Sequence, residues 1–139
     1  MNKILLLILS LLLALIIRSA YNKIVEYYKP ETEDPVLLKI RDRLAPVFPE
    51  IQKIKLYDAN KSYTINKTQV HICMKDENGA YYHDNMLTYV LLHELAHVRC
   101  DEIGHTDKFY KIFQNLLDQA SSAGLYNPSI PIVQNYCSV

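Results

Sequence analysis

Hydrophobic and polar positions follow three different patterns along the chain, and each pattern predicts a different element. Residues 4–17 are strongly hydrophobic except for Ser10 and Ala14, so they predict a helix without a polar face, which is typical of a membrane segment. Residues 51–57 alternate with a period of two, as a strand with one buried face does. Residues 86–100 are apolar almost all round a helical axis, which predicts a helix buried in the core.

Two further strands are predicted in the middle of the chain. The runs 62–65 and 69–74 are rich in β-forming residues, and residues 66–67 between them suit a hairpin turn. Together with residues 51–57 they predict a three-stranded sheet. His71 lies on the last strand, and we interpret it as a half-exposed strand residue rather than a metal ligand.

Helix boundaries are marked by capping residues. Asp34 followed by a proline indicates the start of a helix at about 35–45. Asp84 is the predicted N-cap of the central helix, and Thr106 is predicted to cap a final amphipathic helix that Gly124 ends. The predicted fold class is α+β: a three-stranded sheet with a buried central helix and flanking helices, preceded by an N-terminal hydrophobic helix.

The chain divides into an apolar leader and one small domain. We predict a membrane anchor or signal segment at 1–21, a juxtamembrane linker at 22–34 and a single domain at 35–139. The apolar run is short for a bilayer, but Lys3 and Arg18 can reach the interface from the helix ends. Small residues are badly placed for cleavage, so we favour an uncleaved single-pass anchor, with secretion after signal-peptide cleavage as the alternative.

Charge and cysteine content limit the partners and the compartment. Beyond residue 18 the chain carries 13 basic and 15 acidic side chains and no basic stripe, so no nucleic-acid partner is expected. Cys73, Cys100 and Cys137 are too widely spaced for a CxxC metal pair. We expect buried free thiols, with one disulfide as the alternative if the domain lies outside the cytosol.

The chemistry-bearing residues are concentrated in the central helix, where residues 93–97 read His-Glu-Leu-Ala-His. Residues four apart lie one turn above each other, so His93 and His97 point toward one spot. Glu94 is rotated by about 100° from His93, which places its carboxylate beside a shared metal, where it can accept a proton from metal-bound water. Three polar groups on a buried helix also need compensation, which a zinc ion supplies. The alternative is that backbone carbonyls satisfy both histidines.

His105 is the best candidate for a third ligand, because catalytic zinc usually has three protein ligands and an open position. It follows His97 by eight residues, after a glycine turn and at the entrance to the next helix. The alternative is a histidine that only caps or stacks there. Asp101 ranks second because it lies four residues after His97, and Glu102 and Asp107 are further alternatives.

At these residues the chain resembles the WLM and SprT-like zinc metallopeptidases. The resemblance spans roughly residues 35–126 and is carried by His-Glu-Leu-Ala-His at 93–97, Gly104-His105-x-x-x-Phe109, and an amphipathic helix ending at Gly124-Leu125-Tyr126. It implies a small zincin-like domain with zinc ligands at His93, His97 and His105 and a general base at Glu94. Those families are associated with cleaving proteins crosslinked to DNA, and we expect only their chemistry to carry over, because this chain has no basic surface pattern.

The sequence therefore predicts a membrane-anchored zinc metallopeptidase that hydrolyses peptide bonds in a protein or peptide substrate. Zn²⁺ would polarise the scissile carbonyl, and Glu94 would activate the zinc-bound water and later protonate the leaving amine. An edge strand, residues 69–74 for example, could hold an extended peptide by strand addition. Tyr110 and Tyr126 are candidate oxyanion donors.

Two other functions remain open at this point. One is a catalytically inactive, zinc-stabilised and membrane-tethered protein-binding module. Glu94 argues against it, because a purely structural zinc site has no use for that acid and is normally closed by a fourth ligand. The other is a metal-free interaction domain, which leaves the polar groups of the central helix unexplained.

Overall fold

The computed structural model describes residues 2–137. These residues form two compact units, and the boundary between them in the sequence lies between Pro30 and Glu31. The first unit is one helix, α1 (Lys3–Tyr27), capped by the Asn2 side chain, and none of its residues is buried. The helix is long and apolar enough to cross a membrane, a property that signal sequences share. It continues into the segment predicted as a linker, so residues 22–27 are helical.

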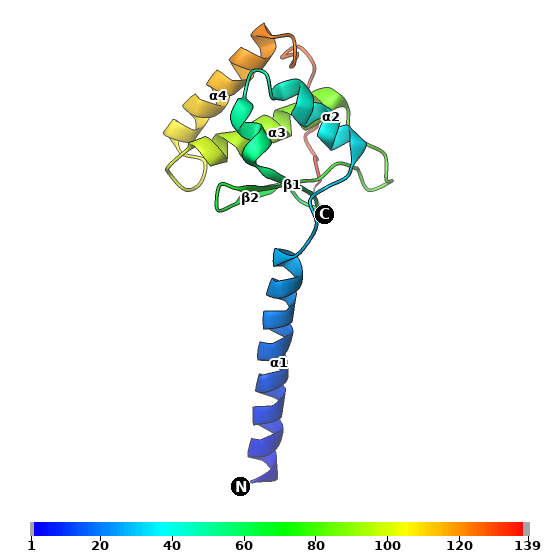
Figure 1. Ribbon diagram of the computed structural model, residues 1–139, viewed down its shortest axis with the longest axis vertical. Helices are drawn as coiled ribbons and strands as arrows, with labels where there is room; N and C mark the ends of the chain where they lie inside the picture. The colour runs from blue at the N-terminus through cyan, green and yellow to red at the C-terminus, as the bar shows by residue number, and fades with distance from the viewer. Residues whose placement is uncertain (1, 138–139) are drawn as a thin grey trace. The chain divides into compact units, whose positions relative to one another are not determined.

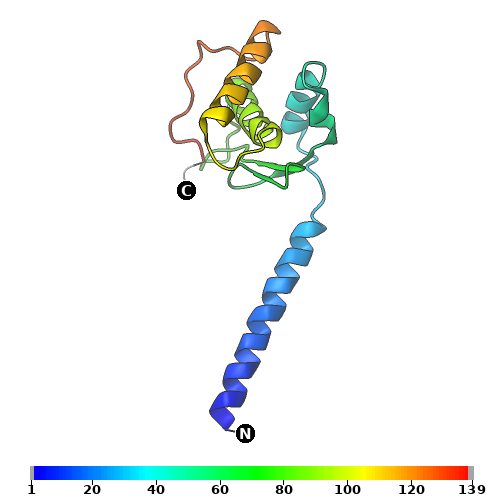
Figure 2. The same ribbon diagram turned by 90° about the vertical axis from the view of Figure 1, so that its left-hand side faces the viewer.

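The second unit is an α+β domain in which the helices cover one face of a sheet (Figures 1 and 2). The predicted fold class is therefore confirmed. Its helices are α2 (Pro35–Leu44), the short 3₁₀ helix η1 (Pro49–Lys53), α3 (Asp84–Arg99) and α4 (Asp107–Ser122). Helix α3 contacts both flanking helices, α2 and α4, and also the sheet.

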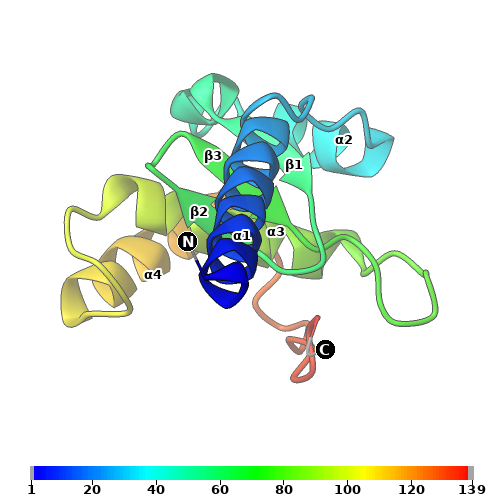
Figure 3. The ribbon, with the colours of Figure 1, turned by 90° about the horizontal axis from the view of Figure 1, so that it is seen from below.

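The sheet has three short strands, β1 (Lys55–Asp58), β2 (Tyr63–Ile65) and β3 (Gln69–Ile72), in the order β1-β3-β2 (Figure 3). Strand β1 pairs parallel with β3, and β2 pairs antiparallel with it. The suggestion that residues 69–74 form an edge strand is wrong, because β1 pairs with the side of β3 that faces away from β2. The two outer strands of the sheet are β1 and β2.

Local sequence signals explain most of the element boundaries. Asp34 caps α2 as predicted, because its Oδ1 accepts hydrogen bonds from two backbone N–H groups of the first turn at 2.9 and 3.2 Å. Residues 66–67 form the predicted hairpin turn with positive φ angles of 49° and 57°. The strand predicted at 51–57 begins only at Lys55, since Pro49 starts a 3₁₀ turn that includes the buried Ile51.

The N-cap of α3 lies one residue earlier than the predicted N-cap, Asp84. His83 is the N-cap, and its Nδ1 accepts a hydrogen bond from the Asn85 N–H at 3.1 Å. Asp84 lies instead in the first turn, where its carboxylate pairs with Lys39 at 3.3 Å and Arg43 at 3.5 Å. The carboxylate is favourable there too, because the N-terminus of a helix carries partial positive charge.

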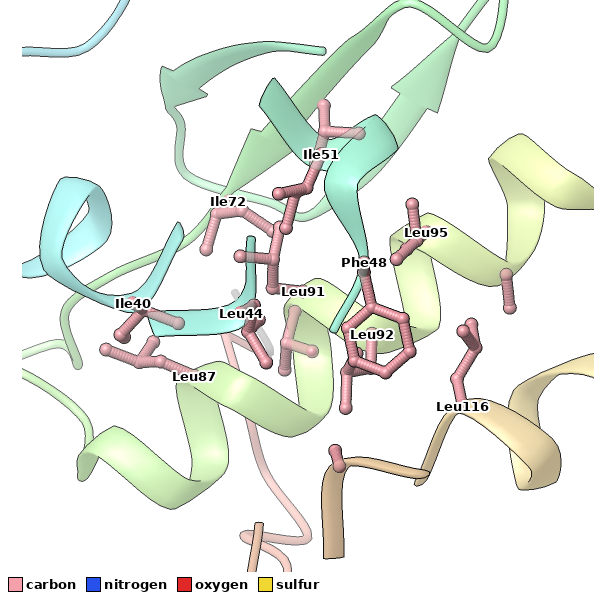
Figure 4. Close-up of a cluster of buried hydrophobic side chains, with 14 of the residues drawn as sticks. Ile40, Leu44, Phe48, Ile51, Ile72, Leu87, Leu91, Leu92, Leu95 and Leu116 are labelled. Carbon is pink, nitrogen blue, oxygen red and sulfur yellow. The ribbon is translucent and has the colours of Figure 1, made fainter. Parts of the chain in front are cut away.

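The core is built around α3, which is buried on almost every side, as the sequence predicted. Figure 4 shows how α3 meets α2, η1, β3 and α4 through these fully buried side chains: Ile40, Leu44, Phe48, Ile51, Ile72, Leu87, Leu91, Leu92, Leu95 and Leu116. Burial of each such aliphatic or aromatic side chain stabilises the folded state by about 1.5–3 kcal/mol relative to leaving it in water. The polar residues of α3 are therefore held on a rigid element.

The C-terminal segment, residues 125–137, has no regular helix or strand and packs back on the domain. A disulfide joins Cys73 at the end of β3 to Cys137, with a Cα–Cα distance of 6.4 Å. The expectation of free thiols is thus wrong for this pair and right for Cys100, which is free and buried. The pairing depends on the path of the C-terminal segment, which brings two cysteines 64 residues apart within bridging distance.

Candidate metal centre and active site

Three histidine side chains from two parts of the chain meet at one point. His93 and His97 come from successive turns of α3, and His105 comes from the link before α4. The Nε2 of His105 lies 3.1 Å from the Nε2 of His93 and 3.2 Å from that of His97, and all three candidate ligand atoms lie within 4.8 Å of one another. Tetrahedral zinc with bonds of about 2.0–2.1 Å separates its ligand nitrogens by roughly 3.3 Å. The donor set therefore fits zinc.

The link between α3 and α4 is shaped to return His105 to α3. Gly104 has a φ of +84°, a left-handed conformation that side chains disfavour, and it reverses the chain just before His105. Thr106 then caps α4 by accepting a hydrogen bond from the Phe109 N–H at 3.3 Å. At the other end of the link the Lys67 Nζ donates to the carbonyl oxygen of Cys100 at 2.6 Å, which satisfies the C-terminus of α3.

The acidic alternatives for the third ligand do not join this group. Asp101 is exposed and its carboxylate pairs with Lys108 at 2.5 Å, which lowers the pKa of Asp101. Within residues 2–137 the histidine triad is the single group of three or more His, Cys, Asp or Glu side chains that could hold a metal ion. Glu102 is exposed, and Asp107 lies in the first turn of α4, where it is favourable to the helix dipole.

Phe109 supports all three histidines from inside the domain. Its ring is fully buried and stacks on His97 with centroids 4.3 Å apart, and it lies 5.0 Å from His93 and 4.9 Å from His105. Phe113 adds an edge contact to His93 at 5.1 Å. The imidazoles are thereby restricted to a few orientations, which lowers the entropy lost when they bind a metal.

The surroundings favour the neutral imidazoles of His93 and His97, which is the form that binds metals. Burial, together with the neighbouring His97 and His105, lowers the pKa of His93 to about 4. Burial and the nearby His105 also lower the pKa of His97. His93 and His97 can therefore offer a nitrogen lone pair to a metal at neutral pH.

Glu94 is buried beside the triad, with 4% of its surface exposed. Burial raises the pKa of Glu94 to about 7, and a hydrogen bond from Thr64 opposes that shift. The Thr64 hydroxyl donates to Oε2 of Glu94 at 2.7 Å and comes from the edge strand β2. A carboxylate with a pKa near the working pH suits general base catalysis.

A cavity of about 540 Å³ opens next to His93 and Glu94. Helix α3 forms one wall of the cavity, and the C-terminal segment forms another, in part through Tyr136. Neither Thr64 nor Tyr136 was predicted from the sequence. The alternation in residues 62–65 could have indicated that Thr64 faces α3, but no local signal marks Tyr136.

Three residues considered from the sequence lie elsewhere. His71 is not half-exposed: it is 1% exposed and stacks between Tyr57 at 4.8 Å and Tyr63 at 4.3 Å, its neighbours on the adjacent strands. Tyr110 is exposed, with its ring 6.1 Å from that of His105. Tyr126 is buried against Tyr89 and does not line the cavity beside Glu94.

The fold and the triad together define a small zincin-like α+β domain with a candidate metal centre. Its fold resembles two crystal structures of Wss1 from Saccharomyces cerevisiae, one of them a mutant. The TM-scores are 0.54 and 0.56, with 19% identity in each case. The first comparison covers 65% of this chain and 80% of that chain, and the comparison with the mutant covers 71% and 90%. No protein-family model matches the sequence.

The chain belongs to the same family as uncharacterized protein 136R of Invertebrate iridescent virus 6. The two are 41% identical in an alignment 143 positions long, which covers 82% of this chain and 80% of the relative. The chain is also 49% identical over 87 residues to uncharacterized protein 042R of Invertebrate iridescent virus 3, and this alignment covers 62% of the chain. It is 32% identical over 117 residues to uncharacterized protein R325 of Acanthamoeba polyphaga mimivirus, and this alignment covers 79% of the chain. The alignments cover 55% and 53% of these two relatives, about half of each.

Proposed function

We propose that this protein is a membrane-anchored zinc metallopeptidase. The observation that carries the proposal is the convergence of three imidazole nitrogens beside a buried glutamate that is held by a hydrogen bond. The similarity of fold to Wss1, a WLM-domain zincin metallopeptidase, supports the same activity, as does the resemblance of residues 93–109 to that family.

The residues divide the work of hydrolysis between them. His93, His97 and His105 would hold zinc, which when bound supplies a Lewis acid that polarises the scissile carbonyl. Glu94 accepts a proton from the attacking water and passes it to the leaving amine. Thr64 keeps the Glu94 carboxylate turned to one side, because its hydroxyl occupies Oε2.

A peptide substrate is supported by the position of β2. Thr64 lies on this outer strand and contacts Glu94, so a peptide that pairs with the outer side of β2 would pass close to the site. Strand addition of this kind uses backbone hydrogen bonds and therefore tolerates many substrate sequences. In this role β2 replaces residues 69–74, which lie in the centre of the sheet.

The binding-module alternative is less well supported. A structural zinc site is normally closed by four protein ligands, whereas within residues 2–137 no fourth His, Cys or carboxylate joins the triad. A module of this kind also has no need of a buried carboxylate beside the metal, whose burial costs free energy.

The anchor and the disulfide together favour a position outside the cytosol. Disulfides persist in oxidising compartments, so the domain with Cys73–Cys137 would lie on the luminal or outer side of the membrane. Mass spectrometry of the protein purified from membranes tests retention of the anchor: an intact N-terminus is expected, whereas a chain that begins near residue 20 would indicate a cleaved signal segment.

The activity is tested on the full chain in detergent micelles with casein as substrate. Cleavage is expected, together with its loss after zinc removal by a chelator and its recovery on addition of zinc but not of magnesium. Cleavage that survives complete zinc removal, or zinc-loaded protein that never cleaves, would contradict the proposal.

Replacement of Thr64 separates positioning of the base from metal binding. Thr64→Val keeps the side-chain shape and removes the hydroxyl. Because a hydrogen bond to a charged group is worth about 1.5–3 kcal/mol, kcat is expected to fall about 10–100-fold, with KM and zinc content unchanged. Thr64→Ser restores the donor and is expected to recover most of the rate. An equal fall in kcat in the valine and serine variants would show that the hydroxyl of residue 64 does not position Glu94.

A further inference from the structure

The cavity beside the candidate metal centre is lined by aliphatic side chains from both the central helix and the C-terminal segment. Val90 lines the cavity on α3 next to His93 and Glu94, and Ile132 and Val133 line it on the C-terminal segment. These three aliphatic side chains line an open cavity of about 540 Å³, a size usual for ligand pockets, in which Val133 is 42% exposed. The positions of Ile132 and Val133 therefore depend on how the C-terminal segment is held.

A closed ring of hydrogen bonds holds the end of this segment. The Cys73 N–H donates to Oγ of Ser62 at 2.9 Å. The Tyr136 hydroxyl donates to the carbonyl oxygen of Cys73, so the 2.7 Å contact between Ser62 and Tyr136 is a hydrogen bond donated by Ser62. Burial raises the pKa of Tyr136 to about 12, which keeps this hydroxyl a donor at neutral pH.

The disulfide closes the same junction covalently. Cys137 follows Tyr136 directly and is bonded to Cys73, and its N–H donates to the hydroxyl of Tyr82 at 3.0 Å. The rings of Tyr82 and Tyr136 also pack with centroids 4.8 Å apart. Ser62 and Tyr136 are thus occupied by the junction. The aliphatic side chains that the segment offers to a ligand are Ile132 and Val133, and Lys61 also lines this cavity.

We propose that this cavity binds one apolar side chain of the peptide substrate, next to the scissile bond, and that the disulfide-anchored C-terminal segment sets its size. The proposal rests on the proposed peptidase function, because it assigns the cavity to a substrate by its contact with His93 and Glu94. The substrate class is a protein or peptide with a leucine, phenylalanine or similar side chain beside the cleaved bond. Burial of such a side chain in an apolar pocket raises kcat/KM by at least about 10-fold over a substrate with alanine at the same position.

The first test compares quenched fluorescent peptides that differ at a single position on either side of the cleaved bond. At one of these positions leucine or phenylalanine is expected to exceed alanine, lysine and glutamate by at least about 10-fold in kcat/KM. Equal rates for all five residues at both positions would overturn the proposal while leaving the peptidase function intact.

Variants of the C-terminal segment test whether this segment determines the preference for an apolar side chain. Val133→Phe narrows the cavity and is expected to lower kcat/KM for the leucine peptide at least about 10-fold, with the alanine peptide little affected. Ile130→Phe is the matched control, because Ile130 is an exposed residue of the same segment that lines a different cavity. An unchanged leucine preference in Val133→Phe, or equal losses in both variants, would contradict the assignment.

A binding measurement on zinc-free protein does not depend on activity. N-acetyl-leucinamide is expected to shift the methyl resonances of Ile132 and Val133 in a saturable way, and N-acetyl-alaninamide is not. Val133→Phe and the double variant Cys73→Ser/Cys137→Ser are expected to weaken this binding, with folding checked by circular dichroism. Saturable binding without any peptidase activity would retain the pocket and reject the proposed function. Absence of saturable binding in folded wild-type protein would reject the pocket.

Discussion

Glu94→Gln is expected to slow peptide hydrolysis strongly and to leave zinc bound. Glutamine keeps the size of the side chain and can still accept the hydrogen bond from Thr64, but it cannot accept a proton from water. Since general base catalysis contributes about 10²–10⁴-fold, kcat is expected to fall by about that factor. Zinc content and casein cleavage are measured on the same preparation, so that loss of metal and loss of chemistry are distinguished.

The matched control for this variant is Glu102→Gln, which makes the same chemical change at an exposed position outside the triad. It is expected to keep wild-type activity. Glu94→Gln should not destabilise the domain, because burial of this carboxyl disfavours its charged form and a neutral amide avoids that cost. A Glu94→Gln enzyme that retains a tenth or more of the wild-type rate would contradict the assignment of the general base.

His105→Ala is expected to weaken zinc binding by more than about 100-fold, which exceeds the 10–100-fold typical of an outer-shell partner. The apo domain should remain folded, since His105 is exposed and the link is held by Gly104, Thr106 and the contact between Lys67 and Cys100. Zinc affinity is measured by competition with a fluorescent chelator, and folding by circular dichroism.

Asp101→Asn is the informative comparison, because Asp101 is the second-ranked ligand on sequence grounds. Its carboxylate pairs with Lys108 and does not join the triad, so its replacement is expected to change zinc affinity only a few-fold. If Asp101→Asn lost zinc and His105→Ala kept it, the third ligand would be the aspartate, and the link would have to rearrange on metal binding.

The elements that the sequence predicted correctly depend on local interactions. Asp34 and Thr106 mark helix starts, because an N-cap bonds to N–H groups only two or three residues away. The buried character of α3 follows from its own apolar periphery. The meeting of His93 and His97 follows from helical spacing alone, so their positions in the sequence are enough to predict it.

The features that the sequence did not reveal depend on distant parts of the chain. The central position of β3 requires parallel pairing with β1 across a connection that is not a hairpin, and the turn at residues 66–67 says nothing about it. The Cys73–Cys137 bridge and the contacts of Tyr136 require the path of the C-terminal segment, which has no periodic pattern. The stacking of His71 likewise follows from the register of three strands.

The proposed substrate pocket illustrates why the geometry of a metal site does not by itself define specificity. The triad and Glu94 come from α3 and the link that follows it, whereas Ile132 and Val133 beside them lie more than thirty positions later in the chain than Glu94. A change in the C-terminal segment can therefore alter which side chain fits without altering the metal ligands. This separation is what allows the Val133→Phe variant to test specificity alone.

The central claim is that three histidines hold a catalytic zinc with one position left for water. Zinc analysis of the full chain, combined with X-ray absorption at the zinc edge, tests it most directly. The expected result is one zinc per chain with three imidazole nitrogens at about 2.0–2.1 Å and one oxygen that does not come from the protein. A protein that purifies folded but binds no zinc, or a zinc closed by a fourth protein ligand, would contradict the account.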